Sequence, residues 1–97
     1  MSARALLIAT LFIAAGCGTS PPVQEMSDAR QAIAAAKDAG AEISAAEDLR
    51  VAEAFLDSAQ RKLSERSYAQ ARRDALRAKA KALAALATAE GPDNDPP

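Results

Sequence analysis

The residue types that most often carry chemistry are scarce in this chain. It has 97 residues, no histidine and a single cysteine, Cys17. Its serines, lysines and carboxylates fall where the caps and polar faces of helices are expected, so they do not converge into a nucleophile, an acid–base pair or a metal site. The sequence therefore predicts a protein that is not an enzyme and that uses no cofactor or metal.

Cys17 follows a stretch with the layout of a secretory signal. Arg4 precedes an apolar segment over 5–15, which is shorter than the roughly 20 residues of a membrane-spanning helix. Ala14-Ala15-Gly16-Cys17 resembles the bacterial lipobox, where a signal peptidase cuts before a lipid-modified cysteine, although Ala14 replaces the usual Leu. The resemblance implies a signal peptide over 1–16 and a lipidated Cys17 at the start of the mature chain. The alternative is an ordinary secretory signal followed by a buried cysteine.

Lipidation at Cys17 would set where the protein resides. Lipoproteins of this kind usually carry three acyl chains, and each buried CH₂ contributes about 0.8 kcal/mol of membrane affinity. Gly18 follows the cysteine, and in the sorting pattern of proteobacterial lipoproteins a residue other than Asp favours the outer membrane. The expected location is the cell envelope, on the inner leaflet of the outer membrane and facing the periplasm. This sorting rule presupposes a two-membrane cell, so the inner membrane stays open as an alternative.

Between a tether over 17–22 and a polar tail over 91–97, apolar residues recur at helical spacing. A first helix contains Met26 and Ile33 and is expected to end at Gly40. A second helix is expected over 45–66 and a third over 68–90. The third carries small apolar residues at alternate spacings of three and four, with Leu76, Leu83 and Leu86 widening the stripe. The sequence thus predicts an all-α domain over 23–90 and a disordered tail over 91–97.

The second and third helices are expected to form an antiparallel hairpin. From Leu63 to Tyr68 the apolar stripe rotates by about 140° at 100° per residue, so one straight helix would place its halves on different sides. A turn near Arg66 and Ser67 removes this conflict. Capping boxes are predicted at the starts of the two helices, in Ser44-Ala45-Ala46-Glu47 and Ser67-Tyr68-Ala69-Gln70.

Charge is sorted along the chain. Residues 25–57 contain eight acidic and three basic side chains, whereas residues 61–81 contain eight basic and two acidic ones. Packing of the third helix against the first two would compensate these charges. The alternative is a basic surface that binds anionic lipid head groups or another envelope protein, made of Arg72, Arg73, Arg77, Lys79 and Lys81. No nucleic-acid partner is predicted, because no aromatic side chains are interleaved to stack on bases.

Two resemblances concern the helical part. Phe55, Ala59, Tyr68, Ala71, Ala75 and Ala78 fall at the spacing of one degenerate tetratricopeptide repeat, which implies a hairpin shape but no ligand, since a single repeat forms no binding groove. Ser27-Asp28-Ala29-Arg30-Gln31-Ala32-Ile33, the Ala39-Gly40-Ala41 break and Tyr68-x2-Ala71-Arg72-x2-Ala75-x2-Ala78-Lys79 resemble the envelope lipoprotein domain catalogued as domain of unknown function 4398. That resemblance covers nearly all of the mature chain and implies no catalytic residues.

Together these features predict a lipid-anchored cell-envelope protein that acts as a structural or protein-interaction (adaptor) module. Its expected partners are the membrane, through the N-terminal lipid, and an envelope protein that the sequence does not identify. Two alternatives stay open. One is a self-associating coiled-coil lipoprotein that spaces the envelope, and the other is a membrane-surface binder that uses the basic third helix.

Overall fold

The structure, a computed structural model, describes residues 20–91 of the chain. Every regular element in this part is a helix: α2 (Val23–Asp38), α3 (Ala41–Ser44), α4 (Ala46–Ser64) and α5 (Tyr68–Glu90). The predicted all-α fold is therefore confirmed, with the single turn α3 as an addition. The predicted signal peptide over 1–16, the lipidation site Cys17 and the tail beyond Gly91 lie outside the described residues. None of the described helices is long and apolar enough to cross a membrane.

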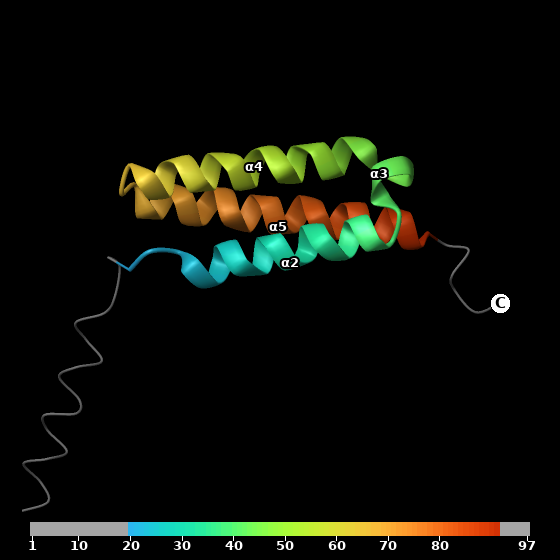
Figure 1. The fold of residues 1–97 in the computed structure, drawn as a ribbon, viewed down its shortest axis with the longest axis horizontal. Coiled ribbons are helices and arrows are strands. Elements are labelled where there is room, and N and C mark those ends of the chain that lie inside the picture. Colours follow the sequence, from blue (N-terminus) through green and yellow to red (C-terminus); the bar gives the residue numbers. More distant parts are fainter. Residues whose placement is uncertain (1–19, 92–97) are drawn as a thin grey trace, which may run out of the picture.

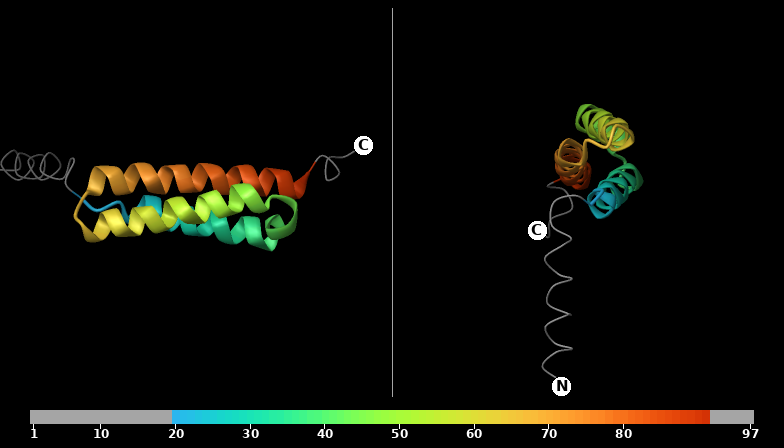
Figure 2. Two further views of the ribbon diagram at one scale, coloured as in Figure 1. Left: turned by 90° about the horizontal axis from the view of Figure 1, so that it is seen from above. Right: turned by 90° about the vertical axis from the view of Figure 1, so that its left-hand side faces the viewer.

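The three long helices form an elongated bundle (Figure 1). Seen end-on, they lie at the corners of a triangle (Figure 2). Helix α4 runs antiparallel to α5, and their contact is the most extensive in the bundle, so the predicted hairpin is present. Helix α2 packs on α5 and runs parallel to it, because the chain reverses once through α3 and again at the α4–α5 turn.

Alanine dominates the core. Helix α5 buries only alanines, whereas the larger buried side chains, Met26, Ile33 and Leu49, come from α2 and α4. A methyl group permits close approach of neighbouring backbones, so α5 can contact both α2 and α4 along its length. The predicted small-residue seam is confirmed at these positions, which are fully buried: Ala71, Ala75, Ala78, Ala82 and Ala85.

Left-handed residues end two of the helices. Gly40 follows α2 with φ 91°, a conformation that glycine adopts without steric cost, and its N–H donates to the Lys37 carbonyl at 3.0 Å. Arg66 follows α4 with φ 62°. The Arg66 N–H donates to the Leu63 carbonyl at 3.0 Å and the Ser67 N–H to the Lys62 carbonyl at 2.9 Å, which is the Schellman pattern. Both predicted turns are confirmed, the second without a glycine.

The predicted capping boxes are wrong. Ser44 is the last residue of α3, and its Oγ donates to the Gly40 carbonyl at 3.1 Å. The hydroxyl is therefore bonded four residues back, and Ala45 becomes the N-cap of α4 without a side-chain hydrogen bond. Ser67 is the N-cap of α5 as expected, yet its side chain makes no capping bond. There the chain direction is fixed by backbone hydrogen bonds of the turn instead.

Candidate functional site

The predicted basic surface is divided by ion pairs between helices. Arg72 Nε lies 3.2 Å from Glu25 Oε2, its Nη2 donates to the Ser20 carbonyl at 3.0 Å, and its side chain is only 31% exposed. Lys79 Nζ lies 3.8 Å from Asp28 Oδ2. Both pairs join α5 to α2, so these two cations are largely committed to holding the bundle together.

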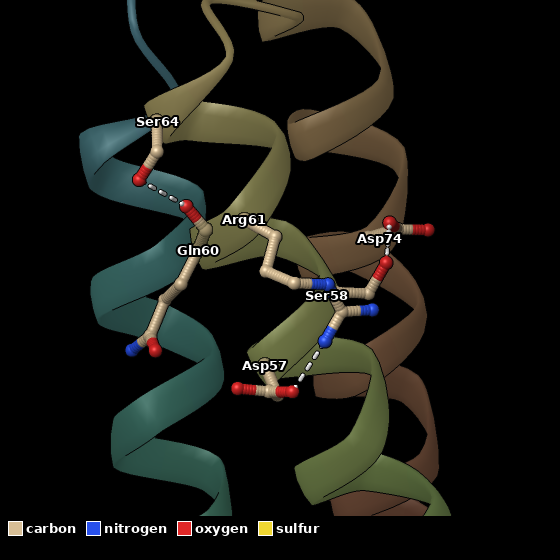
Figure 3. Close-up of polar contacts among 6 residues, drawn as sticks. All are labelled: Asp57, Ser58, Gln60, Arg61, Ser64 and Asp74. Atoms are coloured by element: carbon tan, nitrogen blue, oxygen red, sulfur yellow. Dashed lines mark hydrogen bonds and ion pairs between the residues drawn. The ribbon is translucent and has the colours of Figure 1, made fainter.

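Arg77 lies on the side of α5 that faces α4. Its guanidinium is 5.9 Å from the centroid of the Phe55 ring, within the range of a cation–π contact, and 3.9 Å from Asp74 Oδ1. Asp74 in turn accepts a hydrogen bond from Ser58 Oγ at 2.6 Å, and Figure 3 shows this contact between the two helices. Arg77 therefore contributes to the contact between α4 and α5.

Arg73 and Lys81 are exposed, and no carboxylate of the described part lies within ion-pair distance of either. They are eight residues apart, which is about 12 Å along the helix axis and about 80° around it. Arg77 lies midway between them and contacts Phe55 of α4. The structure thus does not bring the five predicted cations together as one basic face. Arg72 and Lys79 are paired with α2, Arg77 contacts α4 although its side chain is 61% exposed, and Arg73 and Lys81 point to solvent.

Two leucines that were expected to widen the buried stripe are exposed instead. Leu76 is 50% exposed and Leu83 is 45% exposed, while Leu86 packs partly against the core. Leu76 and Leu83 are seven residues apart and therefore share one side of α5. Ala80 and Ala87, which are also exposed, continue the same side. We call these four residues the Leu76–Leu83 face.

Two other large apolar side chains are exposed at opposite ends of the bundle. Ile43 in α3 is 92% exposed and Val23 at the start of α2 is 67% exposed. Each is isolated, and scattered apolar residues of this kind are common on protein surfaces. Leu76 and Leu83, by contrast, lie on the same side of one helix. They are the two exposed large apolar residues of the described part that can form a common contact surface.

Two open pockets lie in the groove between α2 and α4. Lys37 and Glu53 line both pockets, and Lys37 Nζ lies 3.1 Å from Glu53 Oε2. Another lies on α4 beside Val51, Ala54 and Phe55. Within residues 20–91, no three His, Cys, Asp or Glu side chains could hold a metal ion, and no buried side-chain nitrogen or oxygen lacks a hydrogen-bond partner. The features that distinguish this surface are the Leu76–Leu83 face and the unpaired cations.

The family model with the description Domain of unknown function (DUF4398) matches residues 24–92, well over half of the chain. The chain belongs to this family. The DUF4398 match takes in α3, α4, α5 and all of α2 except its first residue. No curated protein and no solved structure matches the chain.

Proposed function

We propose that this DUF4398 chain is a lipid-anchored adaptor of the cell envelope. Cys17 would carry the lipid, and the Leu76–Leu83 face would bind a helix of another envelope protein. The lipobox-like residues before Cys17 support the anchor, and Gly18 supports the inner leaflet of the outer membrane, with the bundle facing the periplasm. The α4–α5 hairpin, which resembles a single tetratricopeptide repeat, would serve as a scaffold for this face.

The observation that carries the adaptor role is the exposure of Leu76 and Leu83 on a helix whose opposite side is buried. Burying an exposed leucine fully contributes about 1.5–3 kcal/mol, so covering two half-exposed leucines would add about the same in total. A partner helix with apolar residues seven apart would fit this spacing, as in the apolar seam between two paired helices.

The charges around the face favour an acidic partner. Arg73 lies three residues before Leu76, is exposed and has no carboxylate partner in the described part. Arg77 is 61% exposed at a distance of 3.9 Å from Asp74. A partner helix with Asp or Glu beside its apolar residues would complement these cations. This charge complementarity would also raise the rate at which the partner associates with the bundle.

A second copy of the chain fits this face poorly. Copies anchored in one membrane stand the same way up, so two α5 helices would meet in parallel. Arg73 would then lie close to the Arg73 of the other copy, which is unfavourable. We therefore propose the adaptor and treat the self-associating spacer as an outcome of the test.

A photoreactive amino acid at position Ala80, between the two leucines, tests the proposal in intact cells. We expect an adduct whose crosslinked peptide carries apolar residues seven apart with Asp or Glu beside them. The adduct should be lost in the Leu76→Ser/Leu83→Ser variant. The matched control is the same probe at Ala54, which is exposed on α4. Equal adducts from both positions would exclude this face as the docking site, and an adduct with a second copy would favour the spacer.

A further inference from the structure

Folding sorts the charges of the chain along the axis of the bundle. The half next to the α4–α5 turn consists of residues 20–30 and 56–79 and holds eight basic against five acidic side chains, a net charge of +3. The other half, residues 31–55 and 80–91, holds three basic against six acidic side chains, a net charge of −3. We call these halves the basic end and the acidic end.

The polarity is clearest among side chains without a partner. Four cations of the basic end have no carboxylate within ion-pair distance in the described part, whereas at the acidic end this holds for one cation. The four are Arg30, Lys62, Arg66 and Arg73, and the one is Lys81. In the same part of the chain, the acidic end leaves Asp38, Glu42 and Asp48 unpaired and the basic end leaves Glu65. The two ends therefore present opposite charge to their surroundings.

Arg66 lies at the tip of the basic end. It occupies the left-handed position of the α4–α5 turn with φ 62°, where glycine is the usual residue, and it is exposed. A cation is thus held at the extremity of the bundle at the cost of an unfavourable backbone conformation. Lys62, one helical turn earlier, reinforces the positive charge there.

The chain also joins the bundle at its basic end. The Ser20 carbonyl accepts a hydrogen bond from Arg72 near the start of α5, and α2 begins at the same end of the bundle as the α4–α5 turn (Figure 1). Three residue steps separate Cys17 from Ser20, and a fully extended chain of that length spans about 10–11 Å. A lipid on Cys17 would therefore hold Ser20, at the basic end, no farther than about 10–11 Å from the bilayer surface. This distance is close to the Debye length, which is about 10 Å at 0.1 M ionic strength.

We propose that the basic end of the bundle binds the anionic phosphate groups of membrane lipids and holds the bundle upright. Arg30, Lys62 and Arg66 provide the contact, and the acidic end with α3 is directed away from the surface. This inference rests on the lipid anchor of the proposed function. It differs from a basic third helix lying on the membrane, because Arg72 and Lys79 form ion pairs with α2 and Arg77 stacks over Phe55 of α4. Each added cation near an anionic surface raises the equilibrium constant for contact with that surface by about fivefold.

The experiment uses the full protein, extracted from its native membrane and reconstituted in vesicles. A donor fluorophore is attached to Ser64→Cys, an exposed position near the turn, and an acceptor is attached to a lipid head group. Vesicles of phosphatidylcholine alone are compared with vesicles that also contain phosphatidylglycerol. We expect more energy transfer with the anionic lipid. In 1 M salt, where the Debye length falls to about 3 Å, the difference should vanish.

Two triple variants of equal charge change separate the basic end from net charge. Arg30→Gln/Lys62→Gln/Arg66→Gln removes three cations of the basic end and should abolish the gain with anionic lipid. Lys37→Gln/Arg50→Gln/Lys81→Gln removes three cations of the acidic end and should leave it intact. Circular dichroism checks that both variants keep their helices, and the salt dependence of the unaltered protein tests the proposal without any variant.

Different experimental results would contradict the lipid anchor and the membrane contact of the basic end. Protein that does not float with either kind of vesicle would overturn the lipid anchor itself. Anchored protein whose energy transfer is the same with both lipids would overturn the contact of the basic end. Equal losses in the two triple variants would likewise contradict this contact, because a general attraction of positive charge would then explain the result.

Discussion

At the scale of single residues, the bundle depends on two left-handed positions that differ in residue type. Gly40 adopts φ 91° as glycine does readily, whereas Arg66 adopts φ 62° with a side chain present. Left-handed geometry costs a non-glycine residue roughly 1–2 kcal/mol. The two turns therefore contribute differently to stability, although both reverse the chain.

Substitutions at these two positions should act in opposite directions. Arg66→Gly should raise the free energy of unfolding by about 0.5–1 kcal/mol, because relief of strain exceeds the added freedom of the unfolded chain. Gly40→Ala should lower it by about 1 kcal/mol through backbone strain alone, since an added Cβ would meet no atom within 4 Å. Urea unfolding checks both. A loss of stability in Arg66→Gly would contradict the assigned strain.

At the scale of elements, the hairpin and the alanine seam could be predicted from the sequence. The rotation of the stripe between Leu63 and Tyr68 located the turn, and the three–four spacing of alanines located the buried side of α5. The exposure of Leu76 and Leu83 could not be predicted this way, because the width of a buried stripe depends on where neighbouring helices lie. The sequence did predict that the basic third helix would pair with acidic residues of the first two, but the individual pairs, Arg72 with Glu25 and Lys79 with Asp28, depend on α2 running parallel to α5.

The seam should tolerate little added volume. Ala75 is fully buried beside Met26 and Ala59, so Ala75→Leu should destabilise the bundle by about 1–3 kcal/mol through overpacking. Ala84→Leu on the exposed side of the same helix should change stability by less than about 0.5 kcal/mol. The two variants make the same chemical change, so equal midpoints in thermal unfolding would exclude close packing at Ala75.

The ion pair between α2 and α5 should contribute modestly. Arg72 and Glu25 are each about one third exposed, so solvent screening limits their coupling. A double-mutant cycle with Arg72→Gln and Glu25→Gln should give a coupling energy below about 1 kcal/mol that decreases further in 1 M salt. A coupling of several kcal/mol would mean that the pair is far better shielded than its exposure indicates.

At the scale of the whole molecule, a small alanine core implies modest stability. Few large side chains are buried, and domains of this length bury only about 60% of the surface that the unfolded chain exposes. Leu49 is 3% exposed and joins the main core cluster, so its loss should matter far more than that of a half-exposed leucine.

Leu49→Ala should therefore cost about 2–5 kcal/mol and leave a measurable unfolded fraction at 37 °C. Leu83→Ala, the same change on the Leu76–Leu83 face, should cost less than about 1 kcal/mol while removing a proposed contact with the partner helix. Far-ultraviolet circular dichroism during thermal unfolding separates the two. A Leu83→Ala protein as unstable as Leu49→Ala would show that this face belongs to the core.

The lipid anchor underlies both the adaptor role and the orientation of the basic end, and the mass of the protein extracted from its native membrane tests it most directly. We predict a chain that begins at Cys17, with a mass increase equal to a thioether-linked diacylglyceryl group and an amide-linked acyl group, confined to the N-terminal peptide. A peptide that continues across positions 16 and 17, or a chain that carries Cys17 as a free thiol, would contradict the account.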